Sequence, residues 1–334
     1  MKTSTDPSPA VAAVLTRGER LAPQLRRFTL AGPTMGSRYS AVFYTATAPD
    51  AAQLGAALQA AVDLVDSQMS TWKPDSDISK FNRAPVGEWL AVPQEFLTVL
   101  LAGLEIGVAS RSAFDVGVGA LVNAWGFGAA GAAPNQRQLA NLAAITRQTT
   151  AERIELDIPS ARIRKRAPLV LDFSGIAKGF GVDRLAACLD AFGITRYLVS
   201  IDGEVRAAGL KPGGAPWMVA IEKPVRAVRD VARVQELGDL ALATSGDYRH
   251  FREHDGATIS HSIDPRTGRP ASNAVSSVSV AAPSCMVADA WATALLVLGE
   301  EAGPRLAESL GLSVLFMVRD EGGTHEIATG QFRD

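Results

Sequence analysis

Asp289 and Thr293 lie four residues apart in an alanine-rich segment, Val287–Leu295, whose pattern is typical of a helix. Residues at this spacing share one face of a helix, so a carboxylate and a hydroxyl come together within one turn. Oxygen ligands of this kind suit a hard cation such as Mg²⁺, which commonly shares its ligands with phosphates. The simpler interpretation is that Asp289 favours the helix dipole and Thr293 bonds back to its own helix. Taken alone, the pair favours this simpler interpretation.

A second candidate site lies at Leu171–Asp183, where an apolar strand is followed by small residues and then by a helix from about Gly175. The free N–H groups and the positive dipole end of a helix N-terminus attract anions, and Lys178 would add a full charge. The segment has neither the spacing of a P-loop nor a Gly-x-Gly-x-x-Gly pattern. Phosphate binding is one interpretation, and the other is that Asp172 or Ser174 simply caps the helix.

Two further segments carry hydroxyl and imidazole groups. Thr244 and Ser245 precede a glycine, where their hydroxyls could bind phosphate or the edge of a substrate. His261 lies three residues before Asp264, and a neutral imidazole is the natural proton carrier near pH 7. The alternative is a hydrogen-bonded strand histidine followed by a turn at 264–268. For an isolated motif, that alternative is the better explanation.

Two tryptophans accompany polar turns and could stack on a flat ligand. Trp72 precedes the polar stretch 75–82, and Trp125 lies within the segment 123–127. Aromatic side chains serve more often as core residues, so the sequence alone favours packing for both of them.

The elements that must position these residues are strands and helices without a regular alternation. Apolar residues recur every three or four positions after Pro49 and after Pro93, which predicts two helices. Residues 154–165 predict a hairpin, Gly193 suits the position after a helix end, and Ser284 is predicted to cap the helix of Asp289. Further strands are predicted at 39–45, 169–171, 197–201, 217–221, 240–244, 248–251, 258–263, 275–281 and 313–318.

This mixture predicts an α+β fold with mostly antiparallel sheet rather than a doubly wound one. No internal repeat and no linker-like break divides the sequence. We therefore expect residues 28–334 to form a single domain and residues 1–27, which are rich in Ala, Pro, Ser and Arg, to form a disordered tail.

Charge and composition exclude some functions. The 334 residues contain 33 Lys and Arg against 35 Asp and Glu, a net charge of -2, which argues against a nucleic-acid partner held by a basic surface. The longest mostly apolar stretch, Phe96–Ala109, is too short for a membrane span. Cys188 and Cys285 cannot form a disulfide framework. No secretory leader is evident, which predicts a cytoplasmic protein, or a periplasmic one if a leader is missing from this chain.

Read in order, the segments resemble the ApbE family of FAD:protein FMN transferases over most of the chain, from about residue 34 to residue 299. The matching segments are Thr34–Gly36, Met69–Asn82, Phe114–Asp115, Trp125–Phe127, Leu171–Asp172, Ala177–Gly179 with Asp183, Lys211–Trp217, Ile221–Pro224, Ala243–Asp247, His261, Asp264–Gly268, Ala288–Ala290 and Ala292–Ala294. None of these segments is decisive alone, and their joint occurrence in one order is highly specific.

The resemblance implies an enzyme that cleaves the pyrophosphate of FAD and attaches FMN through a phosphoester to a Thr or Ser hydroxyl of an acceptor protein, with release of AMP. It implies Mg²⁺ held by the backbone carbonyl of Ala177, by Asp289 and by Thr293. Such a metal would neutralise the pyrophosphate and stabilise the charge of a phosphoryl transition state. FAD and an acceptor protein, expected to be an electron-transfer subunit, are therefore the implied partners.

The resemblance also assigns roles to other residues, and it changes the balance of the alternatives above. Lys178 and the helix amides beside it would hold the phosphates. Our own candidate for handling the proton of the attacking hydroxyl is His261, with Asp264 as its orienter or as a second polar contact. The positions expected to line the FAD site are Met35, Trp72, Asp115 and Asp183, with Thr244 and Ser245 as further contacts.

Several positions depart from the family pattern. Trp72 stands where Tyr is typical, and Val116-Gly117 replaces the usual Pro-Thr. Asp202 replaces the first glycine of a Gly-Gly-Asp motif, and Asp is one of the few residues that tolerates a positive φ. These changes leave two alternatives open: Mg²⁺-dependent hydrolysis of FAD to FMN and AMP, or a non-catalytic FAD-binding accessory protein.

Overall fold

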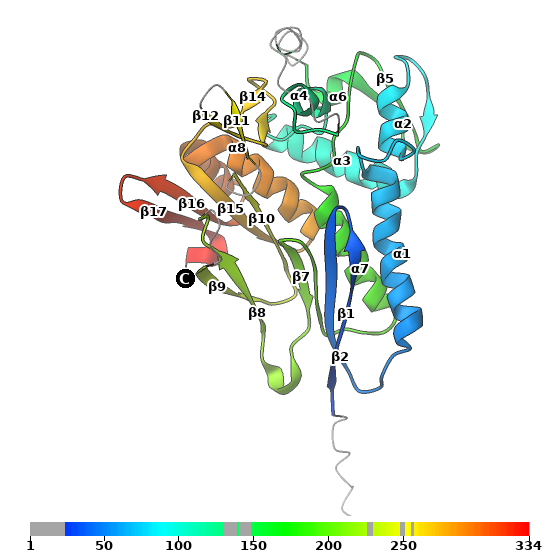
Figure 1. Cartoon of the computed structure of the whole chain (residues 1–334), viewed down its shortest axis with the longest axis vertical. Coiled ribbons are helices and arrows are strands. Elements are labelled where there is room, and N and C mark those ends of the chain that lie inside the picture. Colours follow the sequence, from blue (N-terminus) through cyan, green and yellow to red (C-terminus); the bar gives the residue numbers. More distant parts are fainter. Residues whose placement is uncertain are drawn as a thin grey trace, which may run out of the picture.

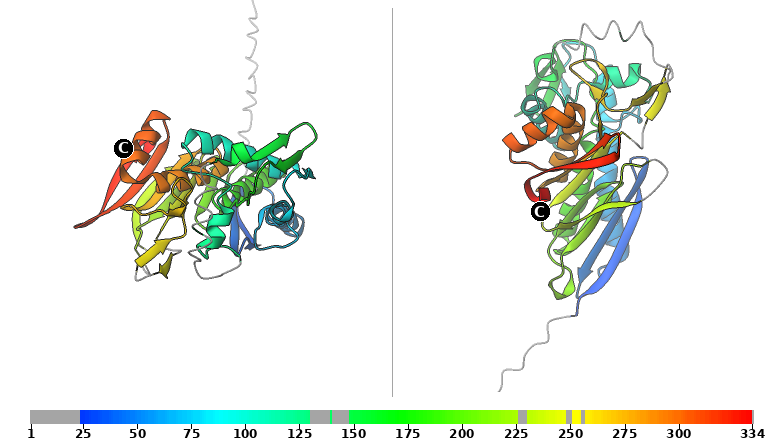
Figure 2. Two further views of the ribbon diagram at one scale, coloured as in Figure 1. Left: turned by 90° about the horizontal axis from the view of Figure 1, so that it is seen from above. Right: turned by 90° about the vertical axis from the view of Figure 1, so that its left-hand side faces the viewer.

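A computed structural model describes residues 24–129, 139, 148–225, 230–247, 251–254 and 257–333. Figures 1 and 2 show one large sheet with helices packed along it and small hairpins at its margins. The combination of helices with mostly antiparallel strands confirms the predicted α+β class. Within the described residues, none of the helices combines the length and the apolar character that crossing a bilayer requires.

The large sheet has eight strands in the order β1-β2-β6-β7-β10-β15-β16-β17, and all neighbouring pairs are antiparallel. Its strands are β1 (Arg26–Thr34), β2 (Ser37–Thr45), β6 (Tyr197–Ile201), β7 (Glu204–Ala208), β10 (Ala241–Gly246), β15 (Val275–Ala282), β16 (Ser313–Asp320) and β17 (Gly323–Thr329). The sheet takes strands from both ends of the described chain. Residues far apart in sequence therefore meet on its surface.

Each face of this sheet has its own cover. Three helices pack on one face: α1 (Ala51–Met69), α7 (Ala177–Ala191) and α8 (Cys285–Ser309). A hairpin of β8 (Trp217–Glu222) and β9 (Val231–Leu237) supplies apolar residues to the core on the other face. Successive side chains of a strand point to opposite faces of the sheet. Every second side chain of each strand therefore faces the helices.

The smaller elements surround the helix layer at the upper end of the molecule in Figure 1. They are α2 (Asp77–Arg83), β3 (Leu90–Ala91), α3 (Gln94–Ala109), α4 (Gly119–Ala124), α6 (Thr150–Arg153), β4 (Ile154–Asp157), β5 (Arg162–Lys165), β11 (Phe251–His254), β12 (Ala257–Ser260), β13 (Ile263–Asp264) and β14 (Arg269–Pro270). Two 3₁₀ turns, η1 (Pro212–Gly214) and η2 (Gly330–Arg333), complete the described chain.

Local sequence signals explain where the main helices begin and end. Asp50 caps α1 by accepting hydrogen bonds from the amides of Ala52 and Gln53, and Ser284 caps α8 through the amide of Val287, as predicted. Gly193 follows α7 with φ 73°, the left-handed conformation that ends many helices.

A few segments differ from the sequence-based predictions. Residues 169–171, predicted as a strand, form only an isolated bridge between Val170 and Val118. β1 begins at Arg26, inside the predicted tail, because Arg26 pairs with Thr45 on β2. Residues 1–23 of that tail, and residues 248–250 of a predicted strand, lie outside the described residues.

The helices α7 and α8 lie in direct contact at Gly179. A Cβ atom added there would lie 2.8 Å from Cβ of Asp289 and would clash with the carbonyl of Cys285. The amide of Gly179 donates a hydrogen bond to Oδ2 of Asp289 over 2.9 Å. The absence of a side chain at this one position therefore sets the separation of the two helices.

We predict that Gly179→Ala destabilises the fold by about 1–3 kcal/mol, because overpacking forces two buried helices apart. Gly55 provides the matched control, since it lies within α1 and a Cβ there would meet nothing within 4 Å. Gly55→Ala should stabilise the protein by about 0.5–1 kcal/mol. Urea denaturation of the two variants tests the contrast, and equal effects would contradict it.

Candidate active site

The three residues expected to bind a metal come together at the junction of α7 and α8. Asp289 lies in the second turn of α8, is only 4% exposed, and contacts the amide of Gly179. Thr293 follows one turn later, and its hydroxyl lies 3.1 Å from where a Cβ of Gly175 would stand. Ala177, the first residue of α7, lies between these two glycines in sequence and is buried. The backbone on either side of Ala177 therefore lies close to Thr293 at Gly175 and to Asp289 at Gly179.

The chemistry of these donors fits a hard cation. Oδ1 of Asp289 accepts no hydrogen bond from the described residues, whereas Oδ2 is bonded to Gly179. The Thr293 hydroxyl lies 3.1 Å from the hydroxyl of Ser245 on β10. No cluster of three or more His, Cys, Asp or Glu suited to a metal occurs in the described part of the chain. A cation at this junction would therefore depend on one carboxylate with hydroxyl and backbone oxygens, a donor set that suits Mg²⁺.

Burial makes ionisation of the Asp289 carboxyl group unfavourable in the absence of a cation. Burial raises the pKa of Asp289 to about 7, and the negative charge of Glu204 adds to this effect. Lys178 and the amide of Gly179 act in the opposite direction and only partly offset it. The ionised form of Asp289 therefore requires more positive charge than the protein supplies.

Lys178 points toward carboxylates rather than into open solvent. Its Nζ lies 2.7 Å from Oε1 of Glu204 and 3.9 Å from Oδ2 of Asp202. Burial lowers the pKa of Lys178, but the charges of Glu204 and Asp289 outweigh burial and raise it, so the ammonium stays charged. Sequence reasoning missed Glu204 as a site residue. The sequence feature that could have indicated Glu204 is its position directly after the Asp202-Gly203 turn.

Asp183 serves the helix junction. Its two carboxylate oxygens accept hydrogen bonds from Arg206 and from three groups at the start of α8. The distances are 2.6 Å from Nη1 of Arg206, 3.0 Å from the amide of Cys285, 2.8 Å from Oγ of Ser284 and 3.0 Å from the amide of Met286. Asp183 thus fixes the first turn of α8 against α7, and this contact explains its position without a ligand.

Thr244 and Ser245 lie on opposite faces of β10. Ser245 faces α8 and contacts Thr293, so the structure brings it to the junction. The Thr244 hydroxyl lies 2.7 Å from Oγ of Ser279, on the face that carries Leu242 and the β8–β9 cover. The large sheet therefore separates the Thr244 hydroxyl from Asp289 and Thr293.

His261 lies between β12 and β13, and Asp264 is the last residue of β13, beside the segment that follows α4. The His261 ring stands edge-on to Phe127, with 6.5 Å between ring centroids, and the indole of Trp125 donates to the carbonyl of Gly268 over 2.9 Å. The Asp264 carboxylate is paired with the guanidinium of Arg266 through contacts of 2.9 and 3.0 Å. Orientation of His261 by Asp264 stays a prediction.

Comparisons with known proteins decide which family this arrangement represents. The sequence model of the ApbE family matches residues 35–316. The chain belongs to the ApbE family. The FAD:protein FMN transferase of Vibrio cholerae is 42% identical over 310 residues, covering 91% of each chain, and that of Escherichia coli K12 is 35% identical over 88% of this chain and 84% of the relative.

Solved structures agree with this assignment. The flavin transferase ApbE from Vibrio cholerae superposes with a TM-score of 0.83 at 40% identity, over 93% of this chain and 99% of that one. The apo form of the Pseudomonas stutzeri flavinyl transferase ApbE gives a TM-score of 0.83 at 36% identity, over 92% and 96% of the two chains. The predicted resemblance to the ApbE family is thereby confirmed.

Two turns of this ApbE chain have positive φ angles near the start of α7. Met35 (φ 47°) and Gly36 (φ 72°) join β1 to β2, and Met35 reaches to 3.0 Å from where a Cβ of Gly181 would stand. Asp202 has φ 54°, as expected for an Asp that replaces a glycine of the ApbE motif. Asp202 therefore adopts the positive φ that a glycine could adopt at this position, so the substitution does not require a different backbone.

Trp72 and Asp115 have very different surroundings. Trp72 is 67% exposed on the loop between α1 and α2, so it is available to a ligand rather than part of the core.

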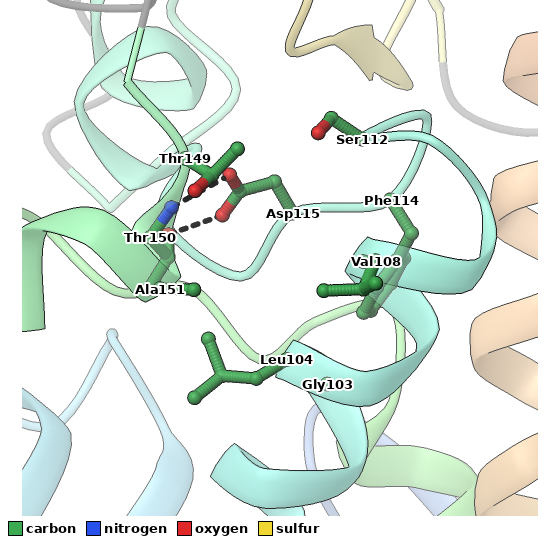
Figure 3. A pocket seen from close by; sticks show the side chains of 10 residues that line it. Gly103, Leu104, Val108, Ser112, Phe114, Asp115, Thr149, Thr150 and Ala151 are labelled. Atoms are coloured by element: carbon green, nitrogen blue, oxygen red, sulfur yellow. Dashed lines mark hydrogen bonds between the residues drawn. The ribbon is translucent and has the colours of Figure 1, made fainter.

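Asp115 borders a hollow of about 30 Å³, and its carboxylate accepts hydrogen bonds from Gly117 (2.7 Å) and from the Thr150 amide (3.0 Å) and hydroxyl (Figure 3). At roughly 10–15 Å³ for each water molecule, that hollow has room for about two waters.

We predict that Asp289→Asn stabilises the metal-free protein at pH 8. The ordinary pKa of this carboxyl is 3.8, whereas burial raises its folded pKa to about 7. Folding takes up a proton between these values, so stability falls as pH rises through this window, and the full penalty remains above pH 7.

The neutral amide removes this penalty and retains an oxygen for the Gly179 amide. Thermal unfolding in EDTA should show a rise of a few degrees at pH 8 and a smaller rise at pH 5. An equal change at both pH values would indicate a packing effect and contradict the electrostatic explanation.

Proposed function

We propose that this chain transfers FMN from FAD to a Thr or Ser hydroxyl of an acceptor protein. One P–O bond of the FAD pyrophosphate breaks, a phosphoester to the acceptor oxygen forms, and AMP leaves. The observation that carries this proposal is that buried Asp289 and half-buried Thr293 lie against Gly179 and Gly175, on either side of Ala177, in a chain of the ApbE family. We call the proposed ligands Ala177, Asp289 and Thr293 the oxygen cradle. Relatives at 35–42% identity carry the name FAD:protein FMN transferase.

In this proposal, Ala177, Asp289 and Thr293 hold Mg²⁺ beside the N-terminus of α7. Bound there, Mg²⁺ would neutralise the pyrophosphate and the charge that develops during phosphoryl transfer. The positive dipole end of α7 favours an anion beside it, while the amides of Ala177 and Gly179 are already bonded to the carbonyl of Phe173 and to Asp289. Lys178 contributes a fixed positive charge at the same end, although its closest partner is Glu204.

His261 is the proposed acceptor for the proton of the attacking hydroxyl, because imidazole can take up and release a proton near neutral pH. The proton passes to the leaving AMP or to solvent once the phosphoester has formed. Trp72 offers an exposed aromatic face to the flavin or the adenine ring.

The purified chain, incubated with FAD, Mg²⁺ and candidate acceptor proteins, is expected to yield AMP and an acceptor heavier by one FMN group. Intact-mass spectrometry of the acceptor and chromatography of the nucleotides measure both products. Asp289→Ala should lower the rate at least a hundredfold, because it removes the only carboxylate of the proposed cradle.

Two outcomes would replace this proposal. Release of free FMN and AMP, with no acceptor labelled, would identify an FAD hydrolase in which water replaces the protein hydroxyl. Tight FAD binding without AMP at any Mg²⁺ concentration would identify a non-catalytic FAD-binding protein.

We predict that Trp72→Ala weakens FAD binding by about tenfold, since loss of a stacked aromatic pair costs of the order of 1 kcal/mol. Trp72→Tyr should retain most of the affinity. Neither variant should change the unfolding midpoint appreciably, because the side chain is 67% exposed. Titration followed by flavin fluorescence measures the affinities, and unchanged binding in Trp72→Ala would exclude a stacking role.

A further inference from the structure

Glu204 is a buried carboxylate whose two oxygens have different surroundings. It is the first residue of β7, only 2% exposed, and its side chain shares the helix-facing side of the strand with Arg206. Oε1 accepts a hydrogen bond from Nζ of Lys178 over 2.7 Å. Oε2 is fully buried and has no hydrogen-bond partner among the described residues.

An unpaired carboxylate oxygen in such a place is costly. Burial of a polar group without a partner costs free energy, and burial of a charge costs more. The cost is increased here because Lys178 is also within reach of the carboxylates of Asp202 and Asp289. Three carboxylates therefore surround one ammonium, and this part of the molecule lacks positive charge.

The proposed cation site offers a partner for this oxygen. Mg²⁺ prefers six oxygen ligands and usually keeps several waters, and the cradle of Ala177, Asp289 and Thr293 supplies only three protein oxygens. Outer carboxylates that accept hydrogen bonds around a metal commonly tune its affinity. Glu204 is close enough to Asp289 for its charge to raise the pKa of Asp289.

We infer that Glu204 is a positioning residue for this cation: Oε1 holds Lys178 in place, and the unpaired Oε2 accepts a hydrogen bond from the cation's hydration shell. This inference rests on the proposed function, because it takes the cradle as the metal site. It differs from a purely structural Lys178–Glu204 pair, for which Oε2 would have no task.

Metal affinity measured without FAD or acceptor tests the inference separately from catalysis. Mn²⁺ is the probe, because it favours the same oxygen ligands and its free form can be followed by electron paramagnetic resonance. Glu204→Gln keeps an oxygen for Lys178 but places an amide group at the second position. We expect at least tenfold weaker Mn²⁺ binding by the full chain, with the unfolding midpoint nearly unchanged.

Asp202→Asn is the matched control. It removes the same charge from the neighbourhood of Lys178, at a more exposed position, and Asn tolerates the positive φ of Asp202. We expect less than a threefold loss of Mn²⁺ affinity. An equal loss in both variants would show a general field effect and overturn the inference, as would unchanged affinity in Glu204→Gln.

Two further variants separate the possible failures. If Glu204→Gln does not fold, Glu204→Asp replaces it: the charge stays but the oxygens are withdrawn, and Mn²⁺ binding should again weaken. Asp289→Asn should abolish Mn²⁺ binding. If Asp289→Asn loses Mn²⁺ binding but the Glu204 variants do not, the inference about Glu204 is refuted and the proposed metal site stands. Intact binding in Asp289→Asn, or no binding by the unchanged protein, would refute the proposed metal site and the inference with it.

Discussion

The contact between α7 and α8 is the constraint on which the candidate site depends. Gly179 lets the helices touch, and its amide bonds directly to Asp289, so the backbone of one helix fixes the carboxylate of the other. Four residues along α7, Asp183 binds the first turn of α8 through three hydrogen bonds. Two contact points one turn apart leave the helices little freedom to slide. The oxygen cradle is therefore held by regular secondary structure, which positions functional groups more accurately than loops do.

Buried charges on β7 define how the sheet meets this helix pair. Glu204 and Arg206 alternate onto the same face, where Glu204 meets Lys178 and Arg206 meets Asp183. Along β7 the negative residue comes first, whereas along α7 the positive residue, Lys178, comes first. Sliding the helix along the strand would place like charges together in a buried setting, where repulsion is strong. The two ion pairs thus specify one register of helix against strand.

Local features of the site could be predicted from the sequence, whereas its long-range partners could not. The spacing of Asp289 and Thr293 places them on one helix face whatever the rest of the fold, and the positive φ of Asp202 follows from the motif it interrupts. The difference between Thr244 and Ser245 depends on which face of β10 meets α8, and that information lies in strands distant in sequence.

The same reason explains why the protein partners of Asp183 and Lys178 could not be predicted. The partners of Asp183 at residues 284–286 are about a hundred positions away. The nearest partner of Lys178, Glu204, lies across a complete helix and strand. Neither contact produces a periodic pattern in the sequence. Each is made by a single side chain, and the apolar pattern of its helix does not depend on that side chain. The roles of Asp183 and Lys178 toward FAD and its phosphates stay predictions.

The pairing of Lys178 also determines how this helix end can attract an anion. With its charge matched by Glu204, Lys178 adds little net potential, and Asp202 and Asp289 make the surroundings negative. A pyrophosphate approaching this metal-free junction would meet carboxylates as well as helix amides. A divalent cation held by these residues would offset the negative charge of the carboxylates and leave the dipole of α7 to favour the phosphates. The same carboxylates that oppose a phosphate at this helix end would therefore favour a cation, so the charges of this junction suit the two ligands together better than the anion alone.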